Sequence, residues 1–259
     1  MDQLVFDRGF TESRERAKTT VMSGHVFVNG QRADKPGMPV GEDAVIEVRG
    51  EALPFVSRGG YKLDKALKVF PVDPAGKVCI DCGASTGGFT DVLLQHGAAK
   101  VYSVDVGYGQ LAWKLRSDPR VVNLERTNLR YVTDEQIPEK LDLAVMDVSF
   151  ISIRLVLPAV KARLKDGADL ICLIKPQFEA GREEVGKKGV VRDEAVHREV
   201  VEQILAFAPT IGLSVLGVDY SPIKGPEGNI EYICHMLNSE EKSQEIDVAA
   251  IVARSHENL

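Results

Sequence analysis

From residue 77 onward, short apolar runs alternate with segments of helical character, and this alternation restricts the fold more than any other feature of the chain. Buried strands are predicted for the runs KVCID, KVYSVD, VVNL, LDLAVMD and ADLICLIK. Strands that alternate with helices form a mostly parallel sheet covered by helices on both faces. The runs LSVLGVDY and NIEYICHML end the series, and the short turn-rich segment between them favours an antiparallel pair. We therefore expect an α/β domain of Rossmann-like architecture.

The segments between these runs have the composition of helices. GGFTDVLLQHG is expected to form a helix that ends at Gly97, and ISIRLVLPAVKARL one that ends near Gly167. GQLAWKLRS and EAVHREVVEQILAFAPTIG complete this set, and YKLDKALKVF precedes the first strand with an apolar face. The polar tail, residues 240–259, is expected to be a peripheral helix or partly disordered.

Residues 1–49 have a different, mixed composition. LVFDRGF and SRERAKTTVMSG predict two short helices, the second capped by Ser13 and ended by Gly24. HVFVNGQRADKPG predicts a strand with a tight turn at Asn29–Gly30, and AVIEV predicts a further strand. We expect a small α+β domain at residues 1–49, a linker at 50–58, the α/β domain at 59–239 and a tail at 240–259.

The overall composition argues against several classes of protein. The formal net charge of −6 does not indicate a generally basic, nucleic-acid-binding surface, although it is compatible with a local basic patch. We expect neither a signal peptide nor a membrane span, because the chain does not start with a basic stretch and an apolar run, and polar residues interrupt VVEQILAFAPTIGLSVLGV. The four cysteines lack the spacing of a zinc site, so we expect reduced packing residues and no metal. These features predict a cytoplasmic protein and leave its oligomeric state open.

A glycine-containing loop, DCGASTGGFTD, follows the first predicted strand of the sheet, where open α/β sheets bind ligands. A P-loop is excluded because no lysine follows the glycines, and a dinucleotide site would need a glycine earlier in the run. The remaining interpretation is S-adenosylmethionine, which needs close backbone approach but no phosphate cradle. Asp105 ends the second strand and could accept both ribose hydroxyls, as in NAD sites, and Asn128 is a candidate adenine contact. The alternative is a tight turn with Asp105 as a helix cap. The candidate cofactor-binding residues are Asp81, Gly83, Ala84, Ser85, Thr86, Gly87, Gly88, Asp105, Asn128 and Asp147.

Charged residues also end or interrupt apolar strands. Asp147 follows LDLAV closely, Lys175 follows LICLI, Glu231 lies in NIEYICHM, and Lys62 lies in the helix ahead of the first strand. Such charges are costly to bury unless they are paired, and the carboxyl ends of parallel strands meet at one edge of the sheet. A lysine removes a proton from a sugar hydroxyl only if its pKa is lowered, for example by burial and a second ammonium. The alternative interpretation is a buried structural ion-pair network.

Several motifs together resemble a known family. Lys62, Asp147, Lys175 and Glu231 resemble the K-D-K-E tetrad of FtsJ-type RNA ribose 2′-O-methyltransferases. SRGGYKL, DCGASTGGFTD, VDVGYGQLAWKLR, ERTN, MDVSFIS, LIKPQFE, VGKKGVVRD and GNIEY are similar to the TlyA, or hemolysin A-like, family within that group. The pattern SR-x-x-A followed by G-x-V-x-VNG resembles the alpha-L RNA-binding module of a small-subunit ribosomal protein. The likeness extends over nearly the whole chain.

The resemblance implies S-adenosylmethionine-dependent methylation of a cytidine 2′-hydroxyl in ribosomal RNA. It implies that Lys175 is the base, with Lys62, Asp147 and Glu231 as its partners. Three other functions remain open: a membrane-active hemolysin-type protein, a non-catalytic ribosome-binding factor and a small-molecule methyltransferase. The last would not need the N-terminal module.

Basic residues occur in two segments that could contact RNA phosphates. One segment lies in the N-terminal module and the other in the loop after Lys175. A solvated helix face and a tolerant loop are the alternative interpretations. Phe150 and Tyr108 could stack on a base or on adenine, although either could equally pack in the core. The candidate RNA-binding residues are Arg14, Lys18, Arg32, Lys35, Arg182, Lys187, Lys188 and Arg192.

Overall fold

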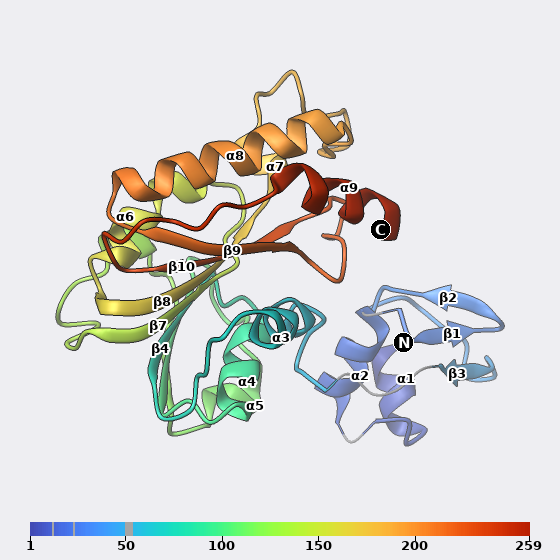
Figure 1. Cartoon of the computed structure of the whole chain (residues 1–259). Helices are drawn as coiled ribbons and strands as arrows, with labels where there is room; N and C mark the ends of the chain where they lie inside the picture. The colour runs from blue at the N-terminus through green and yellow to red at the C-terminus, as the bar shows by residue number, and fades with distance from the viewer. Residues whose placement is uncertain (12, 23, 50–53) are drawn as a thin grey trace.

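A seven-stranded sheet with the strand order β6-β5-β4-β7-β8-β10-β9 forms the centre of the larger domain (Figure 1). The computed structural model describes residues 1–11, 13–22, 24–49 and 54–259. Neighbouring strands from β6 to β8 are parallel, whereas β10 lies between β8 and β9 and is antiparallel to both. The predicted parallel sheet and the antiparallel final pair are therefore confirmed. The strands are β4 (Val78–Cys82), β5 (Lys100–Val104), β6 (Val121–Leu124), β7 (Leu141–Met146), β8 (Leu164–Ile174), β9 (Ser214–Tyr220) and β10 (Tyr232–Leu237).

Helices cover both faces of this sheet (Figure 1). One face is covered by α3 (Gly60–Val69), α4 (Gly88–Gln95) and the short α5 (Trp113–Arg116). The other face is covered by α6 (Leu157–Lys161), α8 (Glu194–Thr210) and α9 (Val248–Asn258). Short elements follow several strands at the carboxyl edge of the sheet: η1 (Leu129–Tyr131), η2 (Ile153–Leu155) and α7 (Pro176–Glu179).

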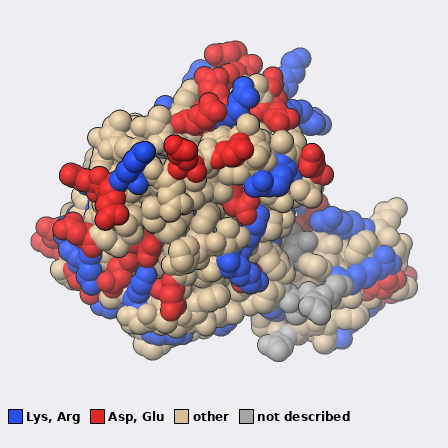
Figure 2. Space-filling model, in the orientation of Figure 1, with Lys and Arg blue, Asp and Glu red and all other residues tan. Residues whose placement is uncertain are grey.

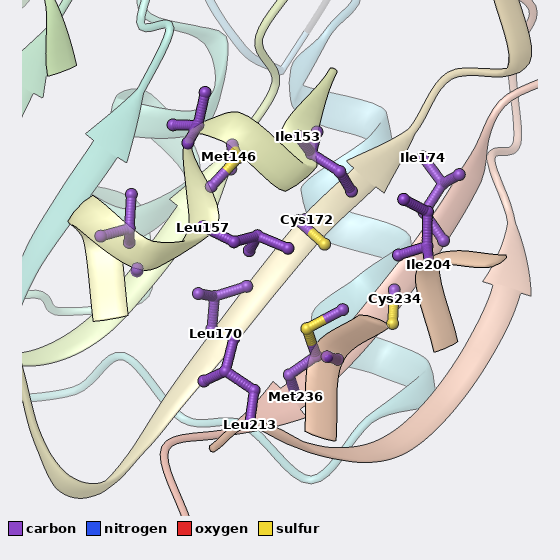
Figure 3. Packing of buried hydrophobic residues seen from close by; sticks show 14 of the residues in the cluster. Met146, Ile153, Leu157, Leu170, Cys172, Ile174, Ile204, Leu213, Cys234 and Met236 are labelled. Atoms are coloured by element: carbon purple, nitrogen blue, oxygen red, sulfur yellow. The ribbon is translucent and has the colours of Figure 1, made fainter. Parts of the chain in front are cut away.

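The central strands are largely apolar because helices bury both of their faces, although β8 begins with an exposed polar stretch at residues 165–167. Figure 3 shows the layer beneath α8, where Ile204 faces side chains from β8 and β10. Cys172 of β8 lies opposite Cys234 of β10 in this layer, and both are buried and free. Cys79 and Cys82 are likewise buried free thiols, so the prediction of packing cysteines is confirmed.

The tail is an integral part of the core. Val248, Ile251 and Val252 of α9 are buried, and the helix packs on α8 and β9. The predicted helix is present, but it is not peripheral, since a regular apolar stripe runs along the otherwise polar sequence.

Two predicted helices are shorter than expected. The segment 109–117 is helical only over α5, because the backbone of Gly109 donates to Glu125 and Ala112 is extended (ψ 140°). The segment 151–164 is divided into η2 and α6, and Pro158 stands in the first turn of α6, where its missing N–H is tolerated.

Residues 1–49 form a separate small module (Figure 1). Ser13 caps α2 by accepting from the Arg16 N–H (3.1 Å), and Asn29 and Gly30 have positive φ in the hairpin turn, both as predicted. Valines and alanines from the helices and strands form its own core. Residues 50–53 of the expected linker lie outside the described part of the chain. The elements are α1 (Asp2–Asp7), α2 (Arg14–Met22), β1 (Val26–Val28), β2 (Gln31–Ala33) and β3 (Ile46–Val48).

Candidate active site at the carboxyl edge of the sheet

The glycine loop connects β4 to α4, and its glycines permit close packing of backbone on backbone. Gly83 and Gly87 have φ of +83° and +95°, which favour glycine. A Cβ on Gly83 would lie 2.9 Å from the carbonyl oxygen of Asp147, and one on Gly88 would lie 2.4 Å from Ser57 Oγ. The glycines therefore bring the loop against β7 and against the segment before α3, as well as leaving the backbone bare toward a ligand.

Asp81, at the end of β4, is fully buried beneath this loop. Its Oδ2 accepts from the backbone N–H of Thr90 (2.8 Å) and from its hydroxyl (2.7 Å). Among the described residues, Oδ1 has no hydrogen-bond partner. Burial raises the pKa of Asp81 to about 7, although the Thr90 hydrogen bonds oppose this effect. Asp81 thus offers an acceptor that a cationic donor such as an ammonium group would satisfy.

Asp105 and Asn128 lie together beside a second part of the site. Asp105 accepts from the backbone N–H groups of Ser85 and Gly107, both at 2.7 Å, and each carboxylate oxygen keeps a further lone pair. Asn128 Oδ1 accepts from the N–H of Arg130 (3.1 Å) and caps η1. The Asp105 carboxylate is consequently oriented by the glycine loop itself.

The structure brings Lys62, Asp147, Lys175 and Glu231 into one buried cluster. Lys62 Nζ lies 2.6 Å from Glu231 Oε2 and 3.2 Å from Asp147 Oδ2. Lys175 Nζ lies 2.6 Å from Asp147 Oδ1 and donates to Ser149 Oγ at 2.9 Å. Both lysines are 6% exposed and Glu231 is 1% exposed. Four charges from α3, β7, β8 and β10 thus meet at one edge, with Asp147 between the two ammonium groups.

Charge pairing outweighs burial in this cluster. Burial alone would lower the pKa of Lys62, but the carboxylates of Asp147 and Glu231 raise it. Burial alone would raise the pKa of Asp147, but Lys62 and Lys175 lower it. Lys62 and Asp147 therefore stay ionised near neutral pH. Lys62 contacts Oδ2 of Asp147, and Lys175 contacts Oδ1 of the same carboxylate.

Two adjoining cavities open beside these groups. One, of about 490 Å³, is lined by Asp81, the glycine loop and the four charged residues of the cluster. The other, of about 470 Å³, is lined by Asp105 and Asn128. Gly83, Ser85, Asp147, Ser149 and Phe150 line both. The arrangement can accept a two-part ligand in which a nucleoside and an ammonium-bearing chain lie on either side of the loop. Ala84, Thr86 and Gly88 also line the first cavity, whereas Gly87 is turned toward Leu111 and Leu115.

The two candidate stacking residues are exposed, and of these Phe150 lines both cavities whereas Tyr108 lines neither. Phe150 is 91% exposed, has a φ of +64° and lies with its ring 5.1 Å from that of Phe178. Tyr108 is also exposed, and the guanidinium of Arg126 lies 4.1 Å from its ring centroid. Neither ring packs in the core, so the core alternative is wrong for both residues.

Several residues of the site were not predicted from the sequence. Ser149 and Gln177 line the first cavity, and Asn229 also contacts the loop after α7. Glu179 is buried and accepts from Ser152 Oγ (2.6 Å) and the Ile153 N–H (2.7 Å), which fastens the loop after β7 to α7. Burial raises its pKa, although these donors oppose the effect. The sequence feature that could have indicated these residues is their position in MDVSFIS, LIKPQFE and GNIEY, which lie directly beside strand ends.

All candidate RNA-binding residues are exposed, and they form two separate groups. In the N-terminal module, Arg14 pairs with Asp2 (2.9 Å), and the guanidinium of Arg32 lies against Gly24. In the loop between α7 and α8, Glu183 and Glu184 accompany the basic residues. Figure 2 shows acidic and basic side chains interspersed over the visible face. The basic groups are therefore local features. They are Arg14, Lys18, Arg32 and Lys35 in the module, and Arg182, Lys187, Lys188 and Arg192 in the loop.

Comparisons with known proteins agree with this architecture. The model of the FtsJ-like methyltransferase family matches residues 55–237, and that of the S4 domain matches residues 1–46. A Bacillus subtilis protein, "Putative rRNA methyltransferase YqxC", is 48% identical over 100% of this chain and 94% of its own length. A Mycobacterium tuberculosis protein, "16S/23S rRNA (cytidine-2′-O)-methyltransferase TlyA", is 46% identical over 90% of this chain and 87% of its own. The solved structure "Putative hemolysin from Streptococcus thermophilus" has a TM-score of 0.81 and 46% identity, covering 99% of this chain and 95% of that one.

Two features are absent from the described part of the chain. Within residues 1–11, 13–22, 24–49 and 54–259, no helix is long and apolar enough to cross a membrane. The same residues contain no group of His, Cys, Asp and Glu side chains placed to hold a metal ion.

Proposed function

Because the chain belongs to the FtsJ-like methyltransferase family, we propose that it uses S-adenosylmethionine to methylate the 2′-hydroxyl of a cytidine in ribosomal RNA. The observation that carries the proposal is the pair of buried lysines that share Asp147 beside the glycine loop. The M. tuberculosis relative, which is named as an rRNA cytidine-2′-O-methyltransferase, supports the choice of acceptor. The S4 domain match supports an RNA substrate.

The two cavities fit the cofactor. Asp105 would accept from the ribose hydroxyls, Asn128 would contact the adenine, and the backbone from Gly83 to Gly88 would lie along the amino-acid chain. The unpartnered Oδ1 of Asp81 would accept from the ammonium group. When bound, the cofactor supplies an electrophilic methyl group on a sulfonium.

Lys175 is the residue that would take the proton of the 2′-hydroxyl. Its amine lies 2.6 Å from Asp147 Oδ1, and Lys62 Nζ lies 3.2 Å from the other oxygen of the same carboxylate. Asp147 contacts this amine directly, and Lys62, which also pairs with Glu231, holds Asp147 in place at the cavity wall. Orientation of the hydroxyl would therefore contribute alongside proton transfer. Ser149, which accepts from Lys175 in the described structure, is a second polar group that the incoming hydroxyl can meet.

The basic residues of the module and of the loop after α7 would contact phosphates of the RNA. They position the acceptor without reading its sequence. The alternative functions predict different results. A small-molecule methyltransferase should keep its activity when residues 1–48 are deleted, and a membrane-active protein should release the contents of liposomes.

The test is transfer of a labelled methyl group to separate ribosomal subunits and to naked rRNA. Lys175→Ala is assayed beside the wild type, with Lys77→Ala as a matched control, since Lys77 lies in a different ion cluster. We expect 2′-O-methylation at a discrete cytidine that is lost only in Lys175→Ala. Cofactor binding without methylation of any of these RNAs would overturn the proposal and favour a non-catalytic factor.

A further inference from the structure

Asn229 uses both ends of its side chain to hold the loop between α7 and α8. It is 2% exposed and lies two residues before Glu231. Its Oδ1 accepts from the N–H of Val191 (3.0 Å), and its Nδ2 donates to the carbonyl of Gly189 (2.9 Å). Its own carbonyl accepts from Gly225 (2.9 Å). The side-chain amide therefore bonds to the backbone of residues 189 and 191 as a neighbouring β-strand would, and it joins two segments that are far apart in the sequence.

The held loop presents two adjacent lysines. Gly189 donates to the carbonyl of Gly186 (2.8 Å), and Gly186 donates to that of Val190 (3.1 Å), so residues 186–190 form a tight turn. Lys187 and Lys188 lie at the tip of this turn and are exposed. Val190 and Val191 are buried and attach its base.

The turn lies at the wall of the cavity of about 490 Å³, and the part of this cavity beside Lys175, where the acceptor hydroxyl would enter, is called the acceptor cavity below. Gly189 and Asn229 both line that cavity, together with Lys175 and Glu231. Lys188 is the residue before Gly189 in the chain, so the two lysines lie directly beside the cavity wall. Two adjacent ammonium groups repel one another and would favour a mobile, spread-out loop, so the position of the tip depends on its attachment at Asn229 and the two valines.

We propose that Asn229 is a positioning residue that fixes the turn 186–190 at the rim of the acceptor cavity, where Lys187 and Lys188 contact phosphates of the RNA strand that carries the target nucleotide. The proposal rests on the proposed function. A neutral amide suits this role, because a carboxylate at the same position would face the carbonyl of Gly189 and add a charge beside Glu231.

The ligand is the sugar–phosphate backbone, which lysines bind as point charges irrespective of sequence. Loss of the two lysines should therefore weaken RNA binding for every sequence and reduce the salt slope by about two. If Asn229 acts through them, loss of its side chain should have the same signature.

The experiment is a double-mutant cycle of Asn229→Ala against Lys187→Ala/Lys188→Ala. The KM for RNA at several salt concentrations, kcat, the cofactor Kd and amide hydrogen exchange are measured. We expect Asn229→Ala to raise the KM roughly tenfold, to lower the salt slope and to speed exchange at Val191, while kcat and the cofactor Kd stay within about threefold. The combined variant should be no worse than the lysine pair, because the effects share one route.

Asn238→Ala is the matched control. Asn238 is also a buried asparagine, and its amide donates to the Lys165 carbonyl (2.9 Å) beyond the opposite end of β10. It should leave the KM for RNA and its salt slope unchanged. Additive effects, or a loss of kcat at constant KM, would overturn the proposal. They would indicate that Asn229 acts on the charged cluster through Glu231 and not on the loop. If the wild type transfers no methyl group, hydrogen exchange and the RNA Kd of the variants still test the role of Asn229 in the loop. Failure of the proposed function can therefore be distinguished from failure of this inference.

Discussion

The sheet carries a lysine–aspartate cluster toward each end, and the two differ in their burial and in what surrounds the aspartate. Asp147 at the carboxyl edge pairs with Lys62 and Lys175, and Asp169 toward the other edge pairs with Lys77 (3.0 Å) and His235 (2.9 Å). Each aspartate thus joins two donors from different elements. The Asp147 cluster contains a second lysine and a glutamate, and it lines the cavity beside the glycine loop. An ion pair by itself therefore does not single out a catalytic site, and our proposal rests on the surplus of buried charge beside the strand-end loops.

The largest expected difference between the clusters is in methyl transfer. Lys175→Met should lower kcat by about 10²- to 10⁴-fold, because the proposed base is lost while the cofactor groups remain. Lys77→Met should leave kcat within about threefold. Single-turnover methylation with saturating cofactor measures both. Equal losses in the two variants would remove the functional distinction between the clusters.

The next difference concerns pH. Burial raises the pKa of Asp81 to about 7, whereas His235 and Lys77 lower the pKa of Asp169 despite burial. The stability that protonated Asp81 contributes is present below pH 3.8 and is lost as the pH rises through about 7, where the carboxylate becomes free to bind a cation. S-adenosylmethionine should therefore bind more tightly with rising pH, by up to about tenfold per unit below pH 7, and Asp81→Asn should abolish this slope. Calorimetric titration from pH 5.5 to 8 tests it.

The stability that Asp169 contributes depends on pH in the opposite sense. The stability it contributes is present above its ordinary pKa and is lost only as the pH falls through the lowered value. Asp169→Asn should cost about 1–2 kcal/mol of unfolding free energy, since Lys77 and His235 lose a shared anion that is largely removed from solvent. Urea unfolding measures the loss, and kcat of the folded variant should be unchanged. A kinetic defect without loss of stability would show that this cluster also serves the reaction.

The smallest expected effect concerns the neutral partner of Lys175. Ser149→Ala removes the acceptor at 2.9 Å and should lower kcat about three- to tenfold while the cofactor Kd stays constant. Ser214→Ala is a suitable control, because Ser214 is buried in β9, donates to the carbonyl of Ser239 (2.9 Å) and lies outside both cavities. An unchanged kcat would mean that Asp147 alone orients the lysine.

Much of the fold is predictable because buried parallel strands must be apolar throughout. KVCID and LDLAVMD show this pattern, and the charged residues that end such runs could be assigned to one edge of the sheet. The helix expected at 109–117 was wrong in length, because Gly109 donates to Glu125 and Ala112 donates to the carbonyl of Thr86, both outside the segment. Local pattern does not contain such contacts.

The same limit applies to the site. Lys62, Asp147, Lys175 and Glu231 are of a type that is costly to bury, so each was conspicuous in an apolar context. Glu179 and Asn229 were not conspicuous, because they lie in a short helix and a polar loop and their partners are 26 and 38 residues away along the chain. Their roles depend on which loops the sheet places together.

The insertion of β10 between β8 and β9 means that β9 joins the sheet only through β10. These two strands can pair first as a hairpin, but both are added to the sheet only when β10 forms its ladder with β8, which lies on the far side of α8 in the chain. Such non-local pairing is slow compared with local helix formation. Glu231 immediately precedes β10, so the charged cluster is completed by the same late step. A partly assembled molecule therefore has the glycine loop without the complete cluster, and methyl transfer reports that the last two strands are in place.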